Sequence, residues 1–185
     1  MIIGISGKSG SGKSTLAKEI IELTNGKAIH LDIDKVGHQV LLLPEVKNEL
    51  INTFGNSVIK SGEVDRKSLG KIVFDSKDEM AKLTAITWKH MQIEIDKFLD
   101  ANKDRIILLD WLLLINTNYF NMCNIKILLD IPYEVRKERA MSRDKITAAA
   151  FDLREKASID FNESDFNYVI KKDDKNTIKR LVELL

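Results

Sequence analysis

Short apolar runs alternate along the chain with longer segments in which apolar residues recur at helical spacing. Two of the runs, at 106–109 and 127–129, are apolar without interruption. Such a run is typical of a strand buried on both faces, as in a parallel sheet covered by helices. The alternation therefore predicts an α/β protein, with a mostly parallel sheet inside a three-layer sandwich. The expected strands are residues 2–5, 28–31, 105–109, 125–129 and 168–170.

The segment between residues 32 and 105 has helical spacing and no run that predicts a strand. It is interpreted as a helical insertion on one side of the sheet, with helices near residues 35–43, 45–54, 66–74 and 77–101. Later in the chain, Pro132 suits the first turn of a helix that extends to about Ser142, because proline has a fixed φ and no N–H. A last helix is expected to start near Asn176.

The length of 185 residues and the 44% hydrophobic content fit one domain with one sizeable core. We expect a single domain over residues 1–185, with a core of about 1–34 and 105–185 and an insertion of about 35–104. The 29 Lys and Arg residues against 28 Asp and Glu give a net charge of +1. No global basic field is available to hold a polynucleotide, so no nucleic-acid partner is expected.

The single cysteine, Cys123, cannot form an internal disulfide, and no cysteine and histidine spacing predicts a zinc site. The longest apolar stretch, residues 106–115, is interrupted by Asp110 and is shorter than the roughly 20 residues that cross a bilayer. The N-terminus has no secretory pattern. We therefore expect a cytoplasmic protein with no membrane partner; no motif addresses its oligomeric state.

A glycine-rich segment follows the first apolar run. Residues 7–14 satisfy the Walker A pattern, and the sequence after them has helical spacing. The glycines let the backbone turn tightly enough for its N–H groups to face phosphate oxygens at the positive end of the helix. Lys13 is expected to reach the β- and γ-phosphates of ATP, and Ser14 to bind Mg²⁺. The predicted nucleotide site comprises Gly7, Lys8, Ser9, Gly10, Ser11, Gly12, Lys13, Ser14 and Thr15.

Carboxylates come at the ends of several predicted strands. Asp32 and Asp34 end the second strand, at the sheet edge where open α/β folds bind ligands, so both are candidates for the base that orients an acceptor hydroxyl. The alternative for Asp34 is a cap on the next helix. Asp110 resembles a Walker B carboxylate that holds Mg²⁺ through water, although Asp130 ends a similar run.

Arg136, Arg139 and Arg143 lie along nearly one face of the helix after Pro132, because they are three and four residues apart. Such a face can close over a triphosphate. The alternative is a solvated charged stripe, since other charged residues lie among the arginines. A GTPase is disfavoured, because residues 102–105 depart from the guanine-reading Asn-Lys-x-Asp pattern at its last position.

The chain resembles the dephospho-coenzyme A kinase family over most of its length, and not in the phosphate loop alone. The likeness lies in a series of short motifs rather than in one. These are the loop at 7–15, the acid-rich segment 31–40, Phe54-Gly55, residues 61–69, Val73-Phe74, Arg139, Arg143-Asp144 and Arg154.

The resemblance implies an ATP- and Mg²⁺-dependent kinase that phosphorylates the ribose 3′-hydroxyl of dephospho-coenzyme A, the last step of coenzyme A synthesis. It favours Asp34 as the acid–base residue, with Asp32 beside it in the acceptor site, and implies that Arg66 helps to hold the acceptor. Arg139 and Arg143 would stabilise the transferring phosphoryl group from a lid of about residues 133–160.

Two departures from the family pattern leave the acceptor open. Trp88-Lys89 stands where the family has His-Pro, and residues 111–115 stand where it has Pro-Leu-Leu followed by Glu. Two alternatives to a dephospho-coenzyme A kinase therefore remain. One is a nucleoside or nucleotide kinase, which would use the same loop and acid with another pocket. The other is a non-catalytic nucleotide-binding regulator that has kept the Walker A loop and lost its acceptor site.

Overall fold

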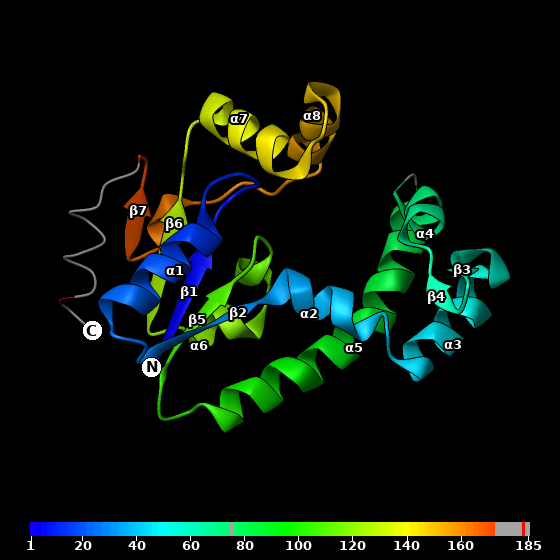
Figure 1. Ribbon diagram of the computed structural model, residues 1–185, viewed down its shortest axis with the longest axis horizontal. Helices are drawn as coiled ribbons and strands as arrows, with labels where there is room; N and C mark the ends of the chain where they lie inside the picture. Colours follow the sequence, from blue (N-terminus) through cyan, green and yellow to red (C-terminus); the bar gives the residue numbers. More distant parts are fainter. Residues whose placement is uncertain (75, 173–182, 184–185) are drawn as a thin grey trace. The chain divides into compact units, whose positions relative to one another are not determined.

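A five-stranded parallel sheet forms the centre of the computed structural model, which describes residues 1–74, 76–172 and 183 (Figure 1). The strand order is β2-β5-β1-β6-β7, so β1 lies in the middle between β5 and β6. Every pairing in this sheet is parallel, as the alternation of apolar runs and helices predicts. The strands are β1 (Ile2–Ser6), β2 (Ala28–Asp32), β5 (Ile106–Asp110), β6 (Ile125–Leu129) and β7 (Tyr168–Ile170).

Helices cover both faces of the sheet, which gives the expected three layers. On one face, α1 (Lys13–Leu23) packs Leu16, Ala17 and Ile20 into the core formed with β1, β5 and β6. On the other face, a Cβ added to Gly4 of β1 would lie 2.8 Å from Cys123 Sγ. This contact places the segment that holds η2 (Leu114–Asn116) and α6 (Asn118–Met122) close against the strand.

Two further helices follow β6. Pro132 immediately precedes α7 (Tyr133–Asp144), which extends two residues beyond the predicted end. Lys145 ends it in the left-handed conformation, with φ 52°. The next helix, α8 (Ala148–Lys156), begins after Thr147, whose hydroxyl accepts a hydrogen bond from the N–H of Ala150. A short turn, η3 (Glu163–Asp165), leads to β7.

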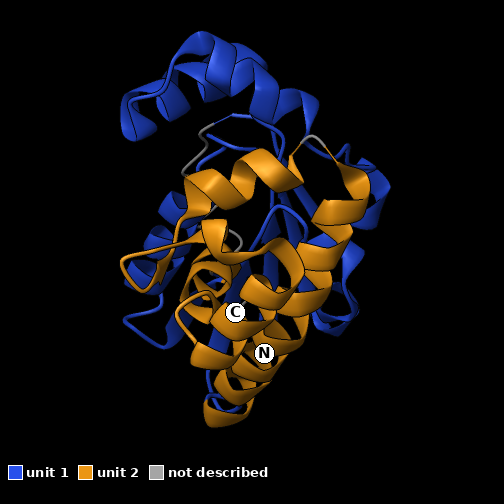
Figure 2. Cartoon of the chain, turned by 90° about the vertical axis from the view of Figure 1, so that its right-hand side faces the viewer, with its two compact units in different colours: residues 1–32, 102–185 blue, residues 33–101 orange. Residues whose placement is uncertain are grey.

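The chain divides into two compact units, residues 1–32 with 102–185 and residues 33–101 (Figure 2). The second unit has its own core, formed by Val46, Leu50, Val58, Leu69, Val73 and Ile86. Its helices agree closely with the predicted ranges. They are α2 (Ile33–Val40), α3 (Pro44–Phe54), α4 (Arg66–Val73) and α5 (Lys77–Ala101); the short 3₁₀ helix η1 (Asn56–Val58) has no predicted counterpart.

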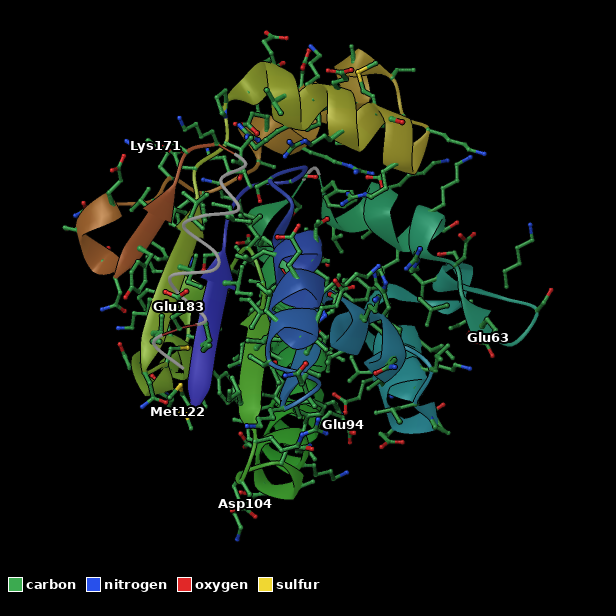
Figure 3. The ribbon with its side chains drawn as sticks, turned by 60° about the vertical axis from the view of Figure 1, so that its left-hand side comes forward. Glu63, Glu94, Asp104, Met122, Lys171 and Glu183 are labelled. Atoms are coloured by element: carbon green, nitrogen blue, oxygen red, sulfur yellow. The ribbon has the colours of Figure 1, made fainter. Side chains whose placement is uncertain are left out.

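The expectation that this segment contains no strand is wrong. The strands β3 (Ile59–Lys60) and β4 (Glu63–Val64) form an antiparallel hairpin, and Figure 3 labels Glu63 in it. The loop residues Ser61 and Gly62 have positive φ values of 52° and 79°, as in the two-residue turns that match the twist of a hairpin. Two-residue strands are too short to show an alternating pattern, so the Ser-Gly turn was their only local signal.

None of the described helices is long and apolar enough to cross a bilayer. The helix predicted from near Asn176 lies outside the described residues.

Candidate active site

The phosphate loop joins the central strand β1 to α1. Gly12 precedes the helix in the left-handed conformation, with φ 95°, and Gly10 has φ 79°. At Gly10 an added Cβ would lie 2.2 Å from the carbonyl oxygen of Arg136 on α7. Glycine is therefore required there both by the backbone conformation and by the close approach of α7.

Lys13, Ser14 and Asp110 come together at the carboxyl edge of the sheet. The Ser14 hydroxyl donates to Asp110 Oδ2 at 2.9 Å, and Lys13 Nζ lies 4.0 Å from Asp110 Oδ1. Lys13 Nζ also donates to the carbonyl of Gly7 at 3.0 Å, across the loop. Asp110 is 3% exposed, so its carboxylate is held in a nearly dry environment by these partners.

The two carboxylates at the strand ends have different surroundings. Asp110 contacts Ser14, whereas Asp130 is exposed and lines a different pocket with Lys8 and Asp160. In the described part of the chain, no three His, Cys, Asp or Glu side chains form a metal cluster. At the loop, the groups that would hold a Mg²⁺ ion are the Ser14 hydroxyl, the Asp110 carboxylate and the oxygens of a bound phosphate. This all-oxygen set fits Mg²⁺ chemistry.

His30 is a member of this cluster that sequence reasoning missed. Its Nε2 lies 3.2 Å from Asp110 Oδ2, and the residue belongs to β2, which pairs with β5. Asp32, the last residue of β2, is the register partner of Asp110. The alternation of side chains in residues 28–32 puts His30 and Asp32 on one face, which was the available signal.

An open pocket of about 590 Å³ joins the loop to α7. Arg139 and Arg143 of α7 line it from one side, and Gly12 and Thr15 line it from the other. A Cβ placed on Gly12 would lie 3.8 Å from Arg139 Nη1. The structure thus brings two of the three arginines to the predicted phosphate site. The remaining lining residues are Gly10, Val135, Glu138 and Ser142.

Arg136 differs from the other two arginines, and neither the phosphate-facing nor the solvated interpretation holds for it. It is 5% exposed and donates through Nη1 and Nη2 to Glu155 at 2.7 and 2.8 Å. The spacing predicts that Arg136 shares a face of α7 with Arg139 and Arg143. In the structure, however, α7 lies against the phosphate loop at Arg136. Its partner on α8 is 19 residues away in sequence and gave no local signal.

Arg143 is held beside the pocket by Asp144. It donates through Nε and Nη2 to Asp144 at 2.7 and 3.1 Å, and Arg154 donates to the same carboxylate at 2.6 Å. Arg143, and then Arg154, lower the pKa of Asp144 to about 2. The pKa of Arg143 is raised, mainly by Asp144 and further by the negative charges of Asp110 and Asp32. The carboxylates at the sheet edge therefore stabilise the positive charge of the Arg143 guanidinium.

Two of the predicted acceptor-site residues, Asp34 and Arg66, belong to the second unit. Asp34 is exposed in the first turn of α2. It lies inside this helix, which begins at Ile33, and so does not precede it as the alternative capping role required. Arg66 is exposed at the first position of α4, whose start is fixed by Asp65. Asp65 Oδ1 accepts from the N–H groups of Lys67 and Ser68 at 3.0 and 3.3 Å.

Comparisons with known proteins point to one family. The family model for dephospho-CoA kinase matches residues 1–176. A dephospho-CoA kinase from Fusobacterium nucleatum is 34% identical over 147 residues, which cover 79% of this chain and 75% of that protein.

Two solved structures share the fold. The structure of TT1252 from Thermus thermophilus has a TM-score of 0.83 at 24% identity, covering 100% of this chain and 98% of that one. Dephospho-CoA kinase from Campylobacter jejuni has a TM-score of 0.60 at 23% identity, covering 99% and 94%. The match of the family model over nearly the whole chain, together with the assembled phosphate loop, shows that this protein belongs to the dephospho-CoA kinase family of phosphotransferases.

Proposed function

We propose that this protein transfers the γ-phosphoryl group of ATP to the ribose 3′-hydroxyl of dephospho-coenzyme A. Family membership supports the substrate pair, and the pocket between the phosphate loop and α7 supports the chemistry. The observation that carries the proposal is the convergence of Lys13, Ser14 and Asp110 in one contact network. We also propose that the protein acts in the cytoplasm, as the sequence led us to expect.

The phosphate loop would bind the triphosphate through its inward-facing N–H groups at the start of α1. Lys13 would leave the carbonyl of Gly7 for the β- and γ-phosphates, where its charge offsets theirs. Ser14 and Asp110 would hold Mg²⁺, which when bound neutralises charge on the same oxygens. The network needs little rearrangement for this, since its hydroxyl and carboxylate are already in contact.

The transfer step is an in-line displacement. The acceptor 3′-oxygen forms a bond to the γ-phosphorus as the bond to the β–γ bridging oxygen breaks, and ADP leaves with that electron pair. Asp34 would orient the hydroxyl and accept its proton, while Asp32 and Arg66 would hold the acceptor. Arg139 and Arg143 would stabilise the charge on the transferred group and exclude water, as the lid of residues about 133–160. The second unit, residues 33–101, would bind the acceptor.

The test is a coupled ADP-release assay with a panel of acceptors: dephospho-coenzyme A, nucleosides and nucleoside monophosphates. The proposal predicts turnover that depends on dephospho-coenzyme A. ³¹P NMR of the product should show a phosphate at the ribose 3′ position. Turnover with a nucleoside or nucleotide alone would instead identify a different kinase. ATP binding without turnover on any acceptor would identify a non-catalytic regulator.

A further inference from the structure

Glu155 of α8 contacts both the phosphate loop and α7. Its carboxylate accepts from both terminal nitrogens of Arg136, at 2.7 and 2.8 Å, and lies 3.4 Å from Lys8 Nζ. Lys8 belongs to the phosphate loop and Arg136 to α7, so one side chain of α8 bridges both. We call Lys8, Arg136 and Glu155 the loop clamp. Figures 1 and 3 draw the loop after β1 beneath the α7–α8 pair.

Arg136 also contacts the backbone of the phosphate loop. Its Nη1 donates to the carbonyl of Ser9 at 3.3 Å, and its Nε donates to the carbonyl of Ile131 at 2.8 Å. Its own carbonyl oxygen occupies the space that a side chain at Gly10 would need. The loop at Ser9 and Gly10 is therefore in contact with both the side chain and the backbone of one residue of α7. A shift of Arg136 would move the loop and α7 relative to each other.

Burial makes Glu155 the critical partner. Arg136 is 5% exposed, and the Glu155 side chain is 21% exposed. Removing one charge from such a pair leaves the other desolvated and uncompensated, which is strongly unfavourable. The hydrogen bonds from Arg136 hold the pKa of Glu155 below its ordinary value, so the carboxylate stays charged at neutral pH. Asp160 makes the shorter contact to Lys8, at 2.9 Å, but it is 98% exposed and its charge is screened.

The geometry points to Glu155 as a positioning residue for the phosphate pocket. Through Arg136 and Lys8 it holds the outer half of the loop, residues 8–10, and sets the position of α7, from which Arg139 reaches the same pocket. This inference rests on the proposed use of the loop to bind ATP. Glu155 itself does not line that pocket, so it acts on the nucleotide only through its partners.

A second ion cluster between the same helices provides a matched control. Asp152 of α8 accepts from Tyr133 OH and, at 3.0 Å, from Lys137 Nζ. Both of these partners belong to α7, so the cluster joins α7 to α8 without a contact to loop residues 7–12 among the interactions of the described residues. Loss of Asp152 therefore weakens the helix pair, whereas loss of Glu155 also releases the loop.

The experiment compares Glu155→Gln with Asp152→Asn in the full chain. Isothermal titration with ATP and Mg²⁺ gives the nucleotide affinity, and circular dichroism verifies folding. We expect Glu155→Gln to raise the ATP Kd by about tenfold or more, the size of a lost charged hydrogen bond, and Asp152→Asn to stay within about twofold. In the steady state, Glu155→Gln should raise the KM for ATP while the KM for the acceptor stays near the native value.

Glu155→Asp serves if Glu155→Gln fails to fold, because it keeps the charge and shortens the reach. It should weaken ATP binding by an intermediate factor, about threefold. A folded Glu155→Gln or Glu155→Asp variant with native ATP affinity would overturn the inference, and so would equal losses in the Glu155 and Asp152 variants. Failure of the native protein to bind ATP would instead contradict the proposed function, so the two failures are distinct.

Discussion

The polar residues packed around the phosphate loop and those we propose for the acceptor differ in their burial and contacts. Asp110 and Arg136 are 3% and 5% exposed, and each is bound by several partners. Asp34 and Arg66 lie exposed in the first turns of α2 and α4, within the second unit. Pockets that stabilise charge act best when their dipoles are fixed before the substrate arrives. The comparison teaches that the polar residues around the phosphate loop are buried and fixed by contacts within this chain, while the two residues proposed for the acceptor lie exposed in the first turns of helices.

The largest effect is expected from a substitution in the phosphate loop itself. Lys13→Ala removes the cation that would meet the β- and γ-phosphates, so we predict a fall in kcat of about 10³-fold. The coupled ADP-release assay measures it, and calorimetry should show weaker ATP binding as well. Arg66→Ala is the counterpart in the second unit and should raise the acceptor KM with little change in ATP affinity. A Lys13→Ala variant within tenfold of native kcat would contradict the assignment.

Arg139→Ala tests whether α7 contributes to catalysis from across the pocket. The arginine lies near Gly12, where a transferring phosphoryl group would develop charge, so kcat should fall by about a hundredfold. ATP affinity should change less than kcat, because the interaction strengthens in the transition state. Val135→Ala, on the same pocket rim without a charge, is the control and should stay close to native. Equal losses in the two variants would indicate damage to the helix instead.

A core substitution separates stability from both sites. In Gly4→Ala the added methyl group would lie 2.8 Å from Cys123 Sγ and 3.0 Å from Leu114 Cδ2, so overpacking should lower the free energy of unfolding by about 1–3 kcal/mol. Urea denaturation measures this change. The additional substitution Cys123→Ala should recover part of the loss by making room, and ATP affinity should remain native in the folded protein. No recovery would place the clash elsewhere.

The smallest effect concerns the anchor of Arg143. The pKa of Asp144 falls from 3.8 in the unfolded chain to about 2 in the folded protein, so its stabilising contribution is complete above about pH 4 and is lost as the pH falls toward 2. Arg143 and Arg154 are 63% and 47% exposed, so screening limits the contribution to about 1 kcal/mol. Denaturation of the native protein and Asp144→Asn at pH 7 and pH 3 should show a difference that shrinks at the lower pH. A difference independent of pH would contradict the linkage.

Most of the sheet and the helices could be predicted because their signals are local. Uninterrupted apolar runs mark β5 and β6, and the glycine pattern marks the loop that precedes α1. The hairpin at residues 59–64 was missed because two-residue strands carry no periodicity. The phosphate-loop residues were predicted by type and spacing, since the Walker A pattern specifies its own backbone.

The long-range contacts could not be predicted from spacing. Asp110 ends β5 and Asp130 follows β6, and both strands flank β1. What distinguishes the two carboxylates is the position of Ser14, which contacts Asp110. The spacing of three residues places Arg136 and Arg139 on nearly one face of α7. The burial of Arg136, however, depends on its contacts with Glu155 and with the phosphate loop. The contact of His30 with Asp110 spans 80 residues and depends on the pairing of β2 with β5.

The most direct test of phosphoryl transfer in this protein is Asp34→Asn, measured for ATP affinity by calorimetry and for turnover with dephospho-coenzyme A. The substitution keeps the shape of the side chain and removes the proton acceptor, so kcat should fall by about a hundredfold or more while the ATP Kd stays within about twofold. That result would separate the acceptor base from the preorganised phosphate pocket. Native kcat, or a loss of ATP affinity as large as the loss of turnover, would contradict the account.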